Sequence, residues 1–202
     1  MTPHLPGTDA DWDRRYGPGL DVAAALHFSD LDAARRAADF LAGGLIARRG
    51  VIDLGAGAGK FVIAAAARHP DIAWVGVDFS ETLVHEAEAW RERYRIANAH
   101  FLHADLLTVP LSGYGGAYVF NPFGGLLDPD HSGGLIARGR DVEAYRRSVG
   151  ALRQNLRDAP AGFRLVTYFC EAAQVPRGYE PLWTDAKLVG WERGATTPPA
   201  RR

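Results

Sequence analysis

The chain has 202 residues, of which 47% are hydrophobic and 23% charged, and its net charge is −1 at pH 7. This composition is typical of a globular protein that buries a core without disulfides or structural metal, and it excludes a disordered or disulfide-stapled chain. The near-zero charge gives no strong nucleic-acid signal. Cys170 is the single cysteine, and residues 61–67, the longest apolar run, are too short to span a bilayer. Without an apolar leader, we expect a cytoplasmic protein with no membrane partner.

Helical and strand-like patterns alternate along the chain between two ends that are rich in proline and glycine. We expect a loose N-terminal segment over residues 1–20, one folded domain over 21–193 and a flexible tail over 194–202. The patterns predict helices over residues 29–44, 60–70, 80–96 and 141–159, and strands over 50–55, 72–78, 99–105, 116–120, 163–170 and 186–193.

This order of elements, with mostly apolar strands, predicts an α/β fold with a single doubly wound, mostly parallel sheet and helices on both faces. In such sheets ligands bind beyond the carboxyl ends of the strands, where the strand order reverses. The residues that follow each strand are therefore the candidates for a functional site.

Residues 51–61, VIDLGAGAGKF, combine an apolar strand with three glycines at alternate positions and a lysine. A phosphate-binding P-loop requires G-x-x-x-x-G-K-[ST]. If Gly59 and Lys60 form its G-K pair, the first glycine falls on Leu54 and the hydroxyl residue on Phe61. Both positions fail, so the pattern argues against an NTPase.

The dinucleotide fingerprint G-x-G-x-x-G/A matches at Gly55 and Gly57, but its third position falls on Lys60, where close packing needs a small residue. The pattern D-x-G-x-G-x-G, from Asp53 to Gly59, resembles motif I of the class I S-adenosylmethionine-dependent methyltransferases. In that family the glycines let the backbone approach the methionine end of the cofactor, since no Cβ blocks it. The start of the next helix favours the cofactor carboxylate. Asp53 favours its amino group and sulfonium.

Acids also end the second and third predicted strands. Asp78 stands where nucleoside-binding enzymes accept hydrogen bonds from both ribose hydroxyls, although an N-cap role, which Ser80 also fits, is the structural alternative. Phe79 is equally suited to the adenine face and to the core. In the methyltransferase family an acid at the position of Asp105 receives the adenine amine, and its alternative is a solvated loop acid.

The fourth predicted strand ends in the sequence NPF, residues 121–123. This turn resembles the [DN]-P-P-[YF] motif of enzymes that methylate amino or amide nitrogens, with one proline instead of two. The resemblance implies that Asn121 orients an acceptor nitrogen and that Phe123 packs near the methyl group; a plain Asn-Pro turn is the alternative. The long loop that follows, residues 124–140, suits an acceptor-side lid.

We find no metal-ligand spacing in the sequence. The resemblance implies an S-adenosyl-L-methionine-dependent methyltransferase with an unidentified acceptor, a small molecule or a protein. The turn at residues 121–123 is the one feature that points to a nitrogen of that acceptor. Two other functions stay open. One is an NAD-dependent oxidoreductase, because it shares the use of Asp78. The other is a non-catalytic module that binds the cofactor through the same fold.

Overall fold

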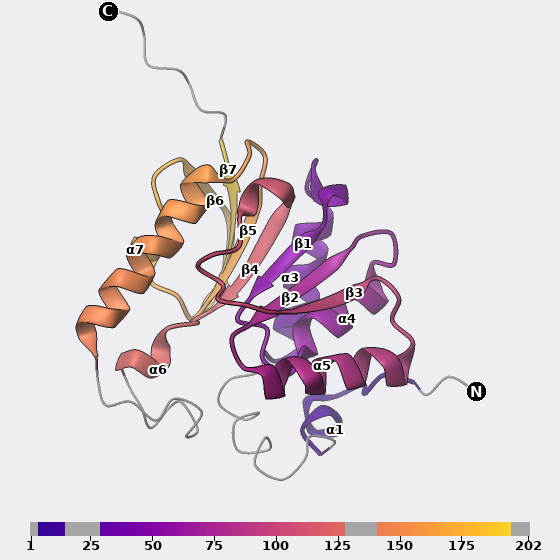
Figure 1. Cartoon of the computed structure of the whole chain (residues 1–202). Helices are drawn as coiled ribbons and strands as arrows, with labels where there is room; N and C mark the ends of the chain where they lie inside the picture. Colours follow the sequence, from indigo (N-terminus) through magenta and orange to yellow (C-terminus); the bar gives the residue numbers. More distant parts are fainter. Residues whose placement is uncertain (1–3, 15–28, 128–140, 195–202) are drawn as a thin grey trace, which may run out of the picture.

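The sheet at the centre of the molecule runs in the order β3-β2-β1-β4-β5-β7-β6 (Figure 1). The computed structural model describes residues 4–14, 29–127 and 141–194. Strands β3, β2, β1, β4 and β5 are parallel, whereas β7 is antiparallel to both β5 and β6. The bounds are β1 Val51–Leu54, β2 Trp74–Asp78, β3 Ala99–His103, β4 Gly116–Phe120, β5 Arg164–Tyr168, β6 Tyr179–Asp185 and β7 Leu188–Arg193.

Helices cover both faces of this sheet, because the central strands are apolar on both sides. One face packs against α3 Leu31–Ala42, α4 Lys60–Arg68 and α5 Glu81–Tyr94, and the other against α7 Val142–Asp158, which α6 Gly124–Leu127 precedes. Short 3-10 turns replace a helix between β3 and β4 and between β5 and β6: η2 Leu111–Gly113 and η4 Ala172–Gln174. A third turn, η1 Ala47–Arg49, leads into β1.

The helices begin where the sequence offers capping side chains. Asp30, Ser80 and Asp141 each accept a hydrogen bond from the backbone N–H three residues on, at the starts of α3, α5 and α7. This satisfies donors that the first turn of a helix leaves without partners. At α5 the cap, Ser80, comes two residues after the end of β2, so the start of this helix is fixed close to that strand end.

The predicted fold class is confirmed, and the strand that the sequence did not reveal is β6. Most side chains of β6 are exposed, and Pro181 lies within it at an irregularity of the pairing with β7. An exposed edge strand needs no apolar alternation, so its sequence carries no strand signal. Of the loop expected over residues 124–140, the first four residues form α6, and 128–140 lie outside the described residues.

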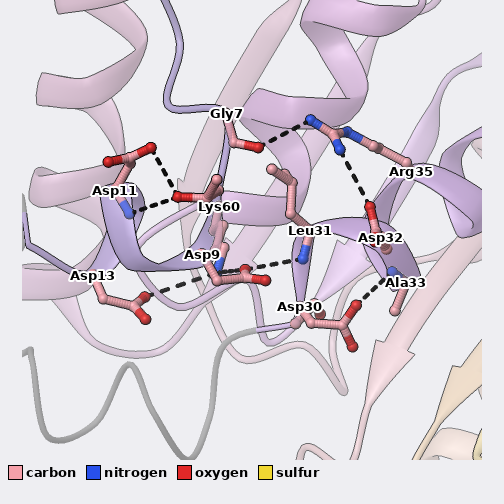
Figure 2. Close-up of polar contacts among 12 residues, drawn as sticks. Gly7, Asp9, Asp11, Asp13, Asp30, Leu31, Asp32, Ala33, Arg35 and Lys60 are labelled. Carbon is pink, nitrogen blue, oxygen red and sulfur yellow. Dashed lines mark hydrogen bonds and ion pairs between the residues drawn. The ribbon is translucent and has the colours of Figure 1, made fainter.

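The described part of the N-terminal segment, residues 4–14, contains a short helix where we expected a loose chain. Helix α1, Asp9–Asp13, is too short to be stable alone, and it docks through Trp12, which is 1% exposed and stacks on Trp90 of α5 with ring centroids 4.7 Å apart. Asp9 accepts hydrogen bonds from the Lys60 ammonium at 2.5 Å and from the Leu31 N–H at 3.0 Å (Figure 2). One carboxylate thus joins α1 to the first residues of α4 and α3.

Removing either partner of this ion pair has unequal effects, because Lys60 is 3% exposed and Asp9 is 45% exposed. Asp9→Ala leaves the buried ammonium with Asp13, 3.8 Å away, as its remaining ion-pair partner among the described residues. We expect this variant to lose about 3 kcal/mol of unfolding free energy. In Lys60→Met the exposed carboxylate is resolvated, and we expect a loss of about 1 kcal/mol or less. Urea denaturation measures both.

The control is Asp32→Ala, which removes the exposed ion pair between Asp32 and Arg35 on α3. Exposed pairs contribute little, so we expect a change below about 0.5 kcal/mol. Equal losses in Asp9→Ala and Lys60→Met would contradict the asymmetry.

Candidate cofactor and acceptor site

The glycine turn between β1 and α4 has a backbone that glycine alone adopts readily. Gly55, Gly57 and Gly59 have φ angles of 93°, 54° and 82°. A Cβ at Gly59 would also lie 2.7 Å from the Phe101 ring and 2.8 Å from the Ala87 methyl. The alternate glycines are therefore required by the path of the chain, whatever ligand the turn holds.

Asp78, at the end of β2, holds this turn in place. Its Oδ2 accepts the Gly57 N–H at 2.9 Å, and its Oδ1 accepts the Ser80 N–H at 2.9 Å. Ser80 itself caps α5, so Asp78 is not that helix's N-cap. Each carboxylate oxygen can accept a second hydrogen bond. Asp78 is 6% exposed, so its carboxylate is a buried acceptor of these two backbone bonds.

Asp53, near the end of β1, is 4% exposed and lines a small cavity of about 20 Å³ next to the glycine turn. Its burial, and then the nearby charge of Asp78, raise the pKa of Asp53 well above its usual range. A cation bound in this cavity would stabilise the ionised carboxylate. The other lining residues are Ser29, Gly55, Ala56, Lys60, Phe61, Tyr118 and Phe120.

The remaining residues expected at the nucleoside end lie on the surface. Phe79 is 62% exposed, so it is not a core residue, and it directly follows the buried Asp78. Asp105 is exposed after β3, and its Oδ1 accepts the Leu107 N–H at 2.9 Å in a local turn. Asp78, Phe79 and Asp105 thus follow neighbouring parallel strands at one edge of the sheet.

The Asn-Pro turn after β4 faces the glycine turn. A Cβ at Gly55 would lie 3.5 Å from Pro122, so the two turns are adjacent. Asn121 has a φ of 33°, and its side-chain amide lies against Gly124, where a Cβ would clash with Nδ2. Phe123 is 7% exposed and packs in the core on the α7 face of the sheet. The structure therefore places Asn121 at the site's rim and Phe123 beneath it.

Several aromatic and hydroxyl side chains line this site that were not singled out in the sequence. Tyr118 and Phe120 share one face of β4, and the Tyr118 hydroxyl lies 2.5 Å from that of Ser29. Phe120 also contacts the ring of Tyr168 at 4.8 Å between centroids. The period of two in β4 is the signal that would have placed Tyr118 and Phe120 together. No local pattern connects Ser29 to them.

Within the described ranges, no group of three or more potential metal-ligating side chains occurs, and no helix is long and apolar enough to cross a membrane. Cys170 is partly buried, and desolvation raises the pKa of its thiol to about 11, as suits an inert thiol.

The chain resembles known methyltransferases in sequence. Residues 51–142 match the family model described as a methyltransferase domain. A segment of 55 residues is 38% identical to a tRNA (guanine-N(7)-)-methyltransferase from Synechococcus sp. (strain JA-3-3Ab), which corresponds to 27% of this chain and 23% of that protein. The match thus spans less than a quarter of the relative's length.

Two solved structures share the fold over most of the chain. Magnesium protoporphyrin IX methyltransferase from Synechocystis PCC 6803, solved with SAM, has a TM-score of 0.61 and 15% identity, with 95% of this chain and 100% of that chain covered. An RNA methyltransferase from Salinibacter ruber, solved with S-adenosyl-L-homocysteine, has a TM-score of 0.54 and 18% identity, with coverages of 84% and 93%.

The raised pKa of Asp53 predicts a specific pH dependence of stability. Because the folded state favours the neutral carboxyl, this contribution is fully present below about pH 4 and is lost as the pH rises through the folded-state pKa. Asp53→Asn removes this loss. We therefore expect the variant to gain unfolding free energy relative to the unmodified protein as the pH is raised from 4 to 8, measured by denaturant titration at each pH.

Asp71→Asn, at an exposed loop position, serves as the control. It measures the effect of removing an exposed carboxylate over the same pH range. If Asp53→Asn gives no larger change with pH than this control, Asp53 ionises at its ordinary pKa and the assignment is wrong.

Proposed function

We propose that the chain, which has the class I fold and matches a methyltransferase-domain model over residues 51–142, transfers the methyl group of S-adenosyl-L-methionine to an acceptor bound beyond β4 and β5. The observation that supports this most directly is the pairing of the glycine turn with Asp78. The turn offers backbone without Cβ atoms, and Asp78 keeps free acceptor capacity on both oxygens.

The residues present fit this cofactor. Asp53 is a buried carboxylate that a cation would stabilise, and it suits the amino group and the sulfonium. Gly55, Gly57 and Gly59 leave room for the methionine end, and the N-terminus of α4 favours its carboxylate. Asp78 would bind the ribose hydroxyls. Phe79 and Asp105 lie nearby for the adenine.

When bound, S-adenosyl-L-methionine supplies an activated methyl on a sulfonium, which a nucleophile displaces in line. The chain then has to position the acceptor, and proximity is its main contribution. Asn121 is proposed to orient an acceptor nitrogen from the rim. Phe123, buried beneath the turn, would act by holding the turn's shape. Phe120 and Tyr168 supply an apolar surface between them.

The acceptor is proposed to be a small molecule or a protein side chain. The relatives reported above include enzymes named for RNA and for a porphyrin, so the family alone does not select among these. The net charge of −1 supports an acceptor other than nucleic acid. A cytoplasmic location is part of the same proposal.

The nicotinamide-dependent alternative makes a different prediction for ligand binding. Thermal unfolding of the purified protein should shift upward with S-adenosyl-L-homocysteine and stay unchanged with NAD or NADH, because Lys60 occupies the position where the dinucleotide fingerprint requires a small residue. Stabilisation by NAD alone would rule out the proposed cofactor.

Asp78→Ala removes the proposed ribose acceptors and the hydrogen bond that holds Gly57. We expect its affinity for S-adenosyl-L-homocysteine, measured by calorimetric titration, to fall more than about tenfold. Asp71→Ala, on the surface, should bind normally. An unchanged affinity in Asp78→Ala would remove Asp78 from the cofactor site.

Methyl transfer itself is tested with S-adenosyl-L-methionine that is tritiated on the methyl group. Incubation with a cell lysate should label its small-molecule fraction or its proteins, and omission of the purified protein gives the background. If binding of S-adenosyl-L-homocysteine is intact but no label above background appears, the non-catalytic module is the better description.

A further inference from the structure

A tyrosine and an aspartate form a hydrogen-bonded pair on the acceptor side of the site. The Tyr168 hydroxyl, at the end of β5, donates to Asp30 Oδ2 at 2.7 Å. The other oxygen of Asp30 accepts the Ala33 N–H at 2.7 Å and caps α3. Asp30 is therefore anchored through one oxygen, and its other oxygen is directed to the phenol.

This pair lies next to the small cavity beside the glycine turn. The Asn121 N–H donates to the Tyr168 carbonyl at 3.2 Å, so Tyr168 directly neighbours the Asn-Pro turn. Its ring contacts that of Phe120, which lines the cavity, and Ser29, the residue before Asp30, lines it too. Tyr168 itself is partly buried.

We propose, building on the methyltransferase function above, that Tyr168 and Asp30 form a proton relay that deprotonates the acceptor. The acceptor's nucleophilic atom forms its bond to the methyl carbon as the carbon–sulfur bond breaks and that electron pair stays on sulfur. The acceptor's proton passes to Tyr168 Oη, and the phenol's own proton passes to Asp30 Oδ2. Charge is balanced, since the positive sulfonium and the negative carboxylate are both neutralised.

The charged groups near the pair favour this arrangement. The charges of Asp30 on α3 and Asp9 on α1 oppose the phenolate, whereas Arg36 on α3 favours it. Burial first, and then the bond to Asp30, raise the pKa of Tyr168 to about 12. The Tyr168 phenol thus stays protonated before the reaction. It therefore acts by passing a proton from the acceptor to Asp30, and not as a phenolate base. Tyr118, on β4, is protonated for the same reason, because burial raises its pKa well above the usual range.

The surroundings of the relay also indicate the class of acceptor. The rings of Phe120, Tyr168 and Phe169 contact one another and form a continuous aromatic surface. Ring centroids are 4.8 Å apart for Phe120 and Tyr168, 4.7 Å for Tyr168 and Phe169, and 5.7 Å for Phe120 and Phe169. Phe169 is 50% exposed and has a φ of 51°, a conformation that is costly for a bulky residue. An aromatic surface beside a proton relay fits a planar aromatic acceptor. The hydroxyl or amine of this acceptor would carry the proton that is lost on methylation.

The purely structural reading is that the bond from Tyr168 to Asp30 only ties β5 to the start of α3. Two variants separate this reading from the relay. Asp30→Asn keeps an oxygen for the Ala33 cap and an amide for contact with Tyr168, but it accepts no proton. Tyr168→Phe keeps the ring and removes the hydroxyl. The control is Tyr179→Phe on β6, which removes a buried hydroxyl that donates to the Leu156 carbonyl of α7.

The experiment measures tritiated methyl transfer into the small-molecule fraction of a cell lysate, together with calorimetric binding of S-adenosyl-L-homocysteine. We expect Asp30→Asn and Tyr168→Phe to transfer about 100-fold more slowly with cofactor affinity unchanged. Tyr179→Phe should lose stability and keep its rate. Normal rates in both relay variants would overturn the relay and leave the proposed function intact. An unmodified protein that transfers no methyl would overturn both.

A second readout does not depend on turnover. In protein labelled with ¹³C at tyrosine Cζ, the Tyr168 resonance is assigned by its loss in Tyr168→Phe. Because Asp30 raises the phenol pKa, Asp30→Asn should lower it from about 12. A Tyr168 titration that is unaffected by Asp30→Asn would show that the two groups are not coupled, and the relay would be wrong.

Discussion

The site depends on one hydrogen bond, from the Gly57 N–H to the Asp78 carboxylate. It joins the turn after β1 to the end of β2, two strands that are parallel neighbours. The turn has three residues with positive φ, and such a backbone persists only where its surroundings determine it. Asp78 supplies that constraint and keeps acceptor capacity for a ligand. The same carboxylate therefore fixes the backbone of the glycine turn and supplies polar acceptor atoms next to it.

The parts of the molecule that could be predicted from sequence are those in which the backbone limits the choice of residue. Gly55, Gly57 and Gly59 are recognisable because other residues fit positive φ poorly. The central strands are recognisable because both of their faces are buried. Strand β6 left no signal, since most of its side chains face solvent. The relay pair also left none, because Asp30 and Tyr168 are 138 residues apart and their meeting depends on how α3 packs against β5.

Lys60 shows how the same residue type can suggest a ligand and serve another purpose. Its position after a glycine turn is that of a phosphate-binding lysine. In the structure its ammonium is buried and paired with Asp9, and this contact brings α1 against the starts of α4 and α3. The N-terminal segment, which sequence composition suggested to be loose, is ordered at residues 9–13 by this charge and by the stacking of Trp12 on Trp90.

Four aspartates around the site differ in role because their environments differ. Asp53 is buried beside the charge of Asp78, so it is disposed to stay neutral until a cation binds next to it. Asp78 is buried, but two backbone N–H groups stabilise its charge. Asp9 neutralises a buried ammonium. Asp30 has one oxygen bonded to the first turn of α3 and the other bonded to the Tyr168 phenol, so the proposed relay uses a different oxygen from the helix cap. In the proposed site, Asp53 near the end of β1 would thus stabilise the positive charge of the cofactor, and Asp30 at the start of α3 would take up the proton that the acceptor releases.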